Sequence, residues 1–178
     1  MDLSKISVGR DIPHDINVVI EIPQYSNVKY EIDKESGALV VDRILFTPMG
    51  YPASYGFVPN TLAKDGDPAD ALVLSPIPLA SGSVVRARPI GLLQMEDEAG
   101  QDEKIICVPH DKVHPQFTDI TEVSQLPQIT RSAIEHFFEN YKSIEPGRWT
   151  RISGWEDRQF AERLIVECRE RFMHEKHT

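Results

Sequence analysis

Three aspartates lie within six residues of one another in the segment 65–70 (DGDPAD). Gly66 permits a sharp bend and Pro68 fixes its own φ, so the segment predicts a stiff loop that can converge its carboxylates on one point. Converging carboxylates repel one another unless a cation lies among them, and their oxygens suit Mg²⁺, Mn²⁺ or Ca²⁺ better than zinc. A solvated turn is the alternative, because Asp, Gly and Pro are ordinary turn residues. An EF-hand loop does not fit, since its twelfth residue would be Pro76 instead of glutamate.

A second acidic cluster, residues 96–98 (EDE) followed by Asp102, comes after a long predicted strand that ends at Met95. A run of charges at the tip of a hairpin is commonly just solvated. Two acidic loops at strand ends could nevertheless meet across the mouth of a barrel and hold several cations together. The sequence therefore leaves open whether the second cluster is solvent-exposed or part of a site.

Basic residues occur in strands where charge is unexpected. In the segment 28–32 (VKYEI), alternation places Lys29 and Glu31 on one face. Arg43 shares a strand face with aliphatic residues such as Val41, and burying a guanidinium among them is costly without an anionic partner. Arg43 either reaches water at the strand end or lines a cleft, where its fork matches phosphate oxygens. Glu21 is predicted on the opposite face of its strand from the aliphatic residues and can point into the same cavity.

Three tyrosines could serve either in the packing of the core or in a functional site. Tyr51 and Tyr55 lie in the segment 49–57, which we expect to be a loop because it holds two glycines and a proline. Tyr141 belongs to an apolar helical stripe. Core filling explains all three, and only the neighbouring Lys142 indicates that this pair could reach a phosphate.

The elements that must position these residues are mostly strands. Segments rich in Val, Ile and Tyr predict strands over residues 15–22, 28–33, 38–46, 71–77, 83–95 and 104–108. Residues 34–37 (KESG) predict the turn of a hairpin, with Gly37 able to adopt positive φ. Apolar residues at helical spacing predict two late helices, one along residues 134–141 and one along residues 160–172. Six strands followed by two helices indicate a β-rich α+β domain with helices packed on a sheet or barrel.

Composition limits the class of protein. The 178 residues fit one domain, and the net charge of −9 argues against nucleic-acid binding, which needs clustered Lys and Arg. The sequence has no run of 18 apolar residues and no apolar signal-peptide core at its start, so we expect a cytoplasmic protein that does not bind membranes. Cys107 and Cys168 are expected to be buried free thiols, which fits a reducing compartment.

Six segments together resemble one family, the soluble inorganic pyrophosphatases of the first structural type, particularly the bacterial short form. They follow in the order of the family and are VVIEIP from Val18, KYEIDKESGALVVDR from Lys29, YPASYGFVPNTL from Tyr51, DGDPAD from Asp65, MEDEAGQDEK from Met95 and HFFENYK from His136. Ala69 stands where the family has a larger aliphatic residue, a departure that affects packing and no ligand.

The resemblance implies a role for each matching residue. The principal Mg²⁺ ligands would be Asp65, Asp70 and Asp102, with Asp97 binding further metal ions, and Asp67 would assist the attacking water. The phosphate-binding groups would be Lys29, Arg43, Tyr55, Lys104, Tyr141 and Lys142. Further active-site positions with less defined roles would be Glu21, Glu31 and Tyr51.

The resemblance also implies the fold and the activity. The fold would be an OB-like, twisted five-stranded β-barrel with flanking α-helices, forming a single domain over residues 1–178. The activity would be hydrolysis of inorganic pyrophosphate to two orthophosphates by direct attack of a metal-activated water. Several Mg²⁺ ions would act in each site, Mn²⁺ or Zn²⁺ would substitute, and Ca²⁺ is expected to inhibit because of its longer, looser coordination. Bacterial members are usually hexamers built as dimers of trimers, and the helix around His136 is a candidate contact.

Two other functions compete with this interpretation. A non-catalytic acidic barrel that binds Ca²⁺ or a protein would explain the aspartate loops but not Lys29, Arg43 and Lys142 together with them. A phosphatase acting on nucleotides or phosphate esters is the second rival. No aromatic element for stacking a base stands out in the sequence, which argues against it.

Overall fold

Five strands close into a small barrel in the computed structural model, which describes residues 2–176. The ring is complete because β7 pairs with both β9 and β2. Around the ring, the strands are β2 (Asp15–Ile22), β5 (Ser54–Phe57), β6 (Asp70–Val73), β9 (Lys104–Pro109) and β7 (Val84–Asp97). All neighbours are antiparallel except β6 and β9, which run parallel. This closed ring confirms the predicted OB-like five-stranded barrel.

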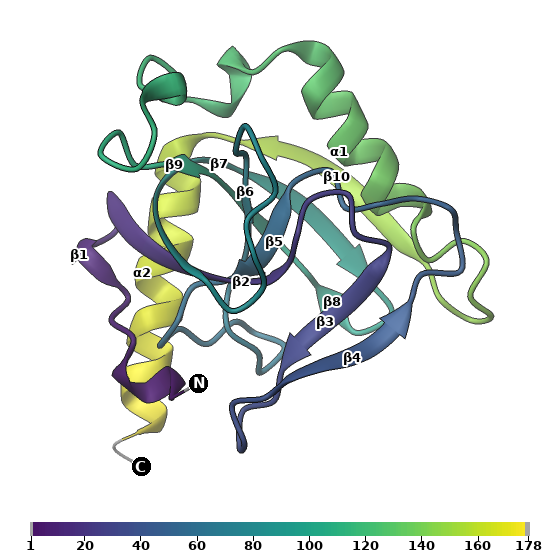
Figure 1. Ribbon diagram of the computed structural model, residues 1–178, viewed down its shortest axis with the longest axis horizontal. Coiled ribbons are helices and arrows are strands. Elements are labelled where there is room, and N and C mark those ends of the chain that lie inside the picture. Colours follow the sequence, from purple (N-terminus) through teal and green to yellow (C-terminus); the bar gives the residue numbers. More distant parts are fainter. Residues whose placement is uncertain (1, 177–178) are drawn as a thin grey trace.

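Further strands extend the barrel, and one hairpin stands apart from it. β1 pairs with β2, β8 and β10 pair with β7, and β3 and β4 form a two-stranded sheet of their own (Figure 1). The strands outside the ring are β1 (Gly9–Asp11), β3 (Val28–Ile32), β4 (Leu39–Ile44), β8 (Gly100–Gln101) and β10 (Thr150–Glu156). The β3–β4 turn has Gly37 at a φ of 66°, as the sequence predicted.

Two α-helices flank the barrel, as expected (Figure 1). α1 (Gln128–Asn140) contacts β10 and buries the predicted stripe, while α2 (Arg158–Glu175) contacts β7 and is capped by Asp157, whose side chain accepts a hydrogen bond from Phe160 N. Short 3₁₀ helices span Leu3–Lys5, Pro115–Phe117 and Val123–Gln125. Within residues 2–176, every helix is too short or too polar to cross a membrane.

The structure corrects several predicted elements. Residues 54–57, expected to be part of a loop, form the barrel strand β5, whose four residues are all buried. Gly56 is required there, because a Cβ would lie 1.8 Å from Val19 O on the adjoining strand. β10 lies between the two helices, so the strands do not all precede them. β6 ends at Val73 instead of residue 77. Pro76 and Pro78 come soon after Val73, and a proline has no backbone N–H to donate to a neighbouring strand.

The buried face of α2 is also rotated from the predicted one. Its fully buried residues are Ala161, Ile165 and Cys168, and the predicted Phe160 and Leu164 pack against this core only partly buried. Cys107 and Cys168 are both buried and free, as predicted. The buried face therefore keeps the predicted Cys168 and otherwise lies one position further along the helix, at Ala161 and Ile165.

Candidate active site

A cavity of about 460 Å³ lies at one end of the barrel, between the β3–β4 hairpin and the residues that follow α1. Every site residue proposed from the sequence lines it. They are Glu21, Lys29, Glu31, Arg43, Tyr51, Tyr55, Asp65, Asp67, Asp70, Asp97, Asp102, Lys104, Tyr141 and Lys142. The structure thus brings together residues from strands and loops that are far apart in the sequence. We call this cavity the cleft.

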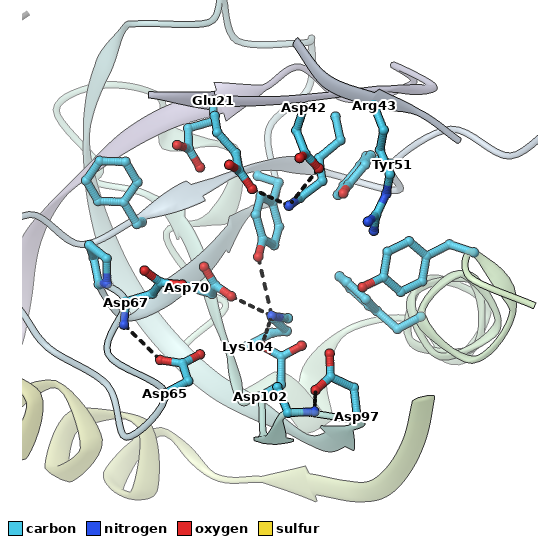
Figure 2. A pocket seen from close by; sticks show the side chains of 18 of the residues that line it. Glu21, Asp42, Arg43, Tyr51, Asp65, Asp67, Asp70, Asp97, Asp102 and Lys104 are labelled. Atoms are coloured by element: carbon cyan, nitrogen blue, oxygen red, sulfur yellow. Dashed lines mark hydrogen bonds and ion pairs between the residues drawn. The ribbon is translucent and has the colours of Figure 1, made fainter. Parts of the chain in front are cut away.

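Lys104 lies at the centre of the cleft with Asp70 and Asp102 turned toward it (Figure 2). The parallel register of β6 and β9 pairs Ala71 with Ile105 and so places Asp70 alongside Lys104. Lys104 Nζ donates to Asp70 Oδ2 at 2.5 Å, to Asp102 Oδ1, and to the Tyr55 hydroxyl at 3.3 Å. The lysine side chain is only 3% exposed. A buried ammonium with all three donors satisfied is therefore held rigidly.

The electrostatics of this cluster favour charge on the lysine. Burial lowers the pKa of Lys104, but the carboxylates of Asp70 and Asp102 outweigh it and raise the pKa above its ordinary value. Burial raises the pKa of Asp70, an effect that Lys104 opposes. The positive charge of Lys104 thus occupies the space between two carboxylates that would otherwise repel each other.

The acidic loop does not converge its three carboxylates on one point, which corrects the expectation from its sequence. Asp65 Oδ1 accepts from Asp67 N at 3.0 Å, and Asp67 Oδ1 pairs with Lys34 Nζ at 2.7 Å. Only Asp70 points at Lys104. Within the described residues, no three His, Cys, Asp or Glu side chains are close enough to hold one ion. Each carboxylate is instead matched to a separate cation or amide.

Lysines on the other walls of the cleft are also paired with carboxylates. Lys29 Nζ contacts Glu31 and lies 3.2 Å from Asp42 Oδ2, which confirms that Lys29 and Glu31 share a face. Lys142 Nζ donates to Asp97 Oδ2 at 2.6 Å, so the second acidic cluster is part of the cleft and not merely a solvated tip. Both ammonium groups retain a donor that these contacts do not use.

Arg43 lines the cleft, but not for the reason expected from its strand. Val41, which was predicted to share its face, is 60% exposed, and a bulge shifts the pairing of β3 with β4 beside Arg43. Arg43 is therefore not an arginine buried among aliphatic side chains. Its Nε lies 3.5 Å from Glu145 Oε1, an anionic partner that the sequence did not indicate.

Glu21 links the barrel to the hairpin. Its Oε1 accepts a hydrogen bond from Ile32 N at 2.7 Å, which ties β2 to β3 at the edge of the cleft. Burial raises the pKa of Glu21 to about 7, the bond from Ile32 opposes the shift, and the charge of Asp70 adds to it. Glu21 therefore takes up or releases a proton near neutral pH when no cation is bound.

The tyrosines serve the core and the cleft together. Tyr51 is 2% exposed and packs on Phe137 with ring centroids 4.7 Å apart, and Tyr141 stacks on the same phenylalanine at 5.1 Å. Burial raises the pKa values of Tyr51, Tyr55 and Tyr141 above the ordinary phenol value. Their hydroxyls therefore stay protonated and can donate hydrogen bonds to an anion.

Three further charged residues line the cleft and were missed at the sequence level, namely Lys34, Asp42 and Arg148. Lys34 lies in the predicted hairpin turn, and Asp42 is adjacent to Arg43. Arg148 ion-pairs with Glu98. The nearby proposed residues were a signal for Lys34 and Asp42 but not for Arg148, which lies six residues after Lys142. The contacts themselves join distant segments, so local periodicity does not predict them.

The charges of the cleft fit divalent cations. Eight acidic and six basic side chains line it, so negative charge is in excess. The carboxylates are spread along the cleft instead of forming one cage, and Mg²⁺ is commonly held by one or two carboxylates with water and substrate oxygens completing its shell. Hard oxygen donors without a histidine or cysteine among the lining residues favour Mg²⁺ or Mn²⁺.

Comparison with known proteins agrees with this architecture. A family model described as inorganic pyrophosphatase matches residues 18–173. An inorganic pyrophosphatase of Gluconobacter oxydans is 68% identical over 168 residues, which cover 94% of this chain and 97% of that protein. One of Caulobacter vibrioides is 60% identical over 158 residues, covering 88% of this chain and 89% of that protein.

Solved structures give the same result. The inorganic pyrophosphatase of Thermus thermophilus has a TM-score of 0.93 at 42% identity, covering 97% of this chain and 99% of that chain. The one of Helicobacter pylori has a TM-score of 0.92 at 48% identity, covering 95% and 99%. The OB-like barrel is thus a fold that this chain shares with these inorganic pyrophosphatases. The chain belongs to the inorganic pyrophosphatase family.

Proposed function

We propose that the chain hydrolyses inorganic pyrophosphate to two orthophosphates, with Mg²⁺ as the divalent cation and direct attack of water. The observation that carries this proposal is the cleft itself, where buried pairs such as Asp70–Lys104 and Asp97–Lys142 place both signs of charge side by side. A substrate that carries several negative charges needs positive charge beside it, from basic side chains and from divalent cations. The divalent cations in turn need carboxylates as ligands. A site for Ca²⁺ alone would not need the lysines.

The residues that would hold the cations are Asp65, Asp70, Asp97 and Asp102. When bound, the divalent cations neutralise the charge of pyrophosphate and lower the pKa of the attacking water. We propose that Mn²⁺ or Zn²⁺ supports activity and that Ca²⁺ inhibits it, because calcium has longer bonds and a less strict geometry.

Basic side chains of this chain bind and orient the substrate. Lys29 and Lys142 each keep a free ammonium donor, and Arg43 directs its guanidinium into the cleft (Figure 2). These cations stabilise the charge that develops on the leaving phosphate. The hydroxyls of Tyr55 and Tyr141 complete the phosphate contacts, and Lys104 would join them once cations bound to Asp70 and Asp102 released its donors.

The proton of the attacking water goes to Asp67. Its side chain is 68% exposed and has Lys34 as its ion-pair partner, so Asp67 can reach water in the cleft and pass the proton on to solvent. No serine, threonine, cysteine or histidine is among the described residues that line the cleft, which is consistent with water as the nucleophile. Glu21, Glu31 and Tyr51 act indirectly, by fixing the hairpin, Lys29 and the aromatic packing.

Phosphate release from a panel of substrates tests this function. With Mg²⁺ present, pyrophosphate is expected to be hydrolysed at least about a hundredfold faster than ATP or phenyl phosphate, because charged side chains are spread along the cleft and match a small anion that is charged at both ends. Comparable rates on ATP or phenyl phosphate would favour a general phosphatase. Binding of Ca²⁺ with no turnover of any substrate would favour a non-catalytic acidic barrel.

We also propose a homo-hexamer in the cytoplasm. Val41, Ile44 and Phe46, on and just after β4, are each at least 60% exposed, which is unusual for apolar side chains and supports an interface. Light scattering at micromolar concentration is expected to give a mass near six times the 20.2 kDa of one chain. A mass near 20 kDa would reject an oligomer. The two buried free thiols support a reducing compartment.

A further inference from the structure

Glu145 lies behind Arg43, outside the residues that line the cleft. The Glu145 side chain is 9% exposed and the Arg43 side chain 22% exposed. Arg43 Nε and Glu145 Oε1 are both buried, lie 3.5 Å apart, and have no hydrogen-bond partner within residues 2–176. Buried polar atoms without partners are rare in folded proteins, and each one needs an explanation. A small shift of either side chain would join these two in a charge-assisted hydrogen bond.

The guanidinium atom of Arg43 that Glu145 contacts decides which nitrogen atoms remain to bind a substrate. A guanidinium carries one Nε–H and two Nη groups, and it binds phosphate best through two parallel donors. An anion at Nε fixes the guanidinium from behind and leaves both Nη groups facing the cleft, where Figure 2 shows the head group of Arg43. Within residues 2–176, Glu145 is the ion-pair partner of Arg43, and Arg43 Nε makes no hydrogen bond that would hold the long side chain in its place.

Glu145 is itself held in a turn that carries a second cleft residue. Glu145 N donates to Lys142 O at 2.9 Å, and Arg148 N donates to Glu145 O at 3.2 Å. Lys142 is anchored to Asp97 on β7. The turn after α1 therefore presents Lys142 to the cleft directly and reaches Arg43 on β4 through Glu145.

We propose that Glu145 is a positioning residue for the phosphate site: it holds Arg43 at Nε so that both Nη groups meet pyrophosphate. This inference rests on the proposed function. Glu145 touches no substrate atom and acts only through Arg43. It also aligns Arg43 with Lys142, so that the two cations bind the same anion from the hairpin and from the helix side.

A double-mutant cycle of Glu145→Gln and Arg43→Lys tests the proposal, with Glu139→Gln as the matched control. Glu139 is an exposed glutamate on α1. Glu145→Gln is expected to lower kcat/KM for pyrophosphate by about tenfold, the size expected for one charge-assisted hydrogen bond, and Glu139→Gln to leave it unchanged. In the Arg43→Lys background, Glu145→Gln is expected to cause no further loss, because lysine has no Nε fork to orient.

Two results would overturn the proposal. Losses that multiply in the double mutant would mean that Glu145 acts independently of Arg43. A lower thermal midpoint with unchanged kcat/KM would mean that the contact only stabilises the fold. Binding of methylenediphosphonate with Mg²⁺, measured calorimetrically on the same four proteins, gives the cycle a readout without turnover. If the unmodified chain fails to hydrolyse pyrophosphate, the proposed function fails, and the binding cycle still decides whether Glu145 orients Arg43 toward an anion.

Discussion

Asp67→Asn is expected to lower turnover by roughly a hundredfold or more while it leaves the Mg²⁺ concentration for half-maximal activity nearly unchanged. Asp67 is exposed and contacts only Lys34 and its own loop, so its loss removes a proton acceptor and no cation ligand. Asp70→Asn is expected to raise the Mg²⁺ requirement, because Asp70 is one of the two carboxylates that face the centre of the cleft. Activity measured against Mg²⁺ concentration separates the two variants.

Asp119→Asn is the matched control, since Asp119 is an exposed aspartate outside the cleft. It is expected to behave like the unmodified chain in the same titration. If Asp67→Asn and Asp70→Asn both shifted only the Mg²⁺ requirement, Asp67 would be a cation ligand and the division of roles would be wrong.

Lys104→Met is expected to destabilise the folded chain by about 3–5 kcal/mol in the absence of divalent cations. The substitution removes a buried ammonium and leaves Asp70 and Asp102 facing each other without a counter-charge. Mg²⁺ is expected to restore part of the lost stability, because a bound cation supplies the missing positive charge. Urea unfolding with chelator and with Mg²⁺ measures both effects.

Lys112→Met, at an exposed lysine outside the cleft, is the control and should unfold like the unmodified chain. If Lys104→Met does not fold without metal, the variant can be purified in Mg²⁺ and then treated with chelator. Loss of its folded structure on chelation would then show the expected destabilisation. An unfolding midpoint for Lys104→Met equal to that of the unmodified chain in chelator would show that the buried charge cluster contributes nothing to stability.

Much of the barrel could be predicted from the sequence, because its longer strands are rich in β-branched residues with turn residues between them. β5 could not, since Ser54 and Gly56 give no apolar alternation, and its burial comes from β2 and β6 on either side. β10 was missed for a similar reason: it is a half-exposed strand, interrupted by Gly154 at a φ of 142°. In both cases the strand is stabilised by its neighbours more than by its own residues.

The residues that line the cleft could be predicted, but the ion pairs between their side chains could not. The spacing of residues indicated Asp65, the resemblance to a known family added residues such as Lys104, and all the proposed residues line the cleft. The partners of Asp67 and Arg43 are Lys34 and Glu145, which come from the hairpin turn and from the turn after α1. Such ion pairs depend on how two distant segments approach each other, and no local pattern encodes that approach.

The most direct test of the central claim is phosphate release from pyrophosphate by the purified chain, first with Mg²⁺, then with excess chelator, and then with Mg²⁺ restored. Negative charge exceeds positive charge along the cleft. Chelation is therefore expected to abolish hydrolysis and added Mg²⁺ to recover it, whereas Ca²⁺ added in its place should not. Hydrolysis that continued at the same rate after exhaustive chelation would contradict a cation-dependent mechanism.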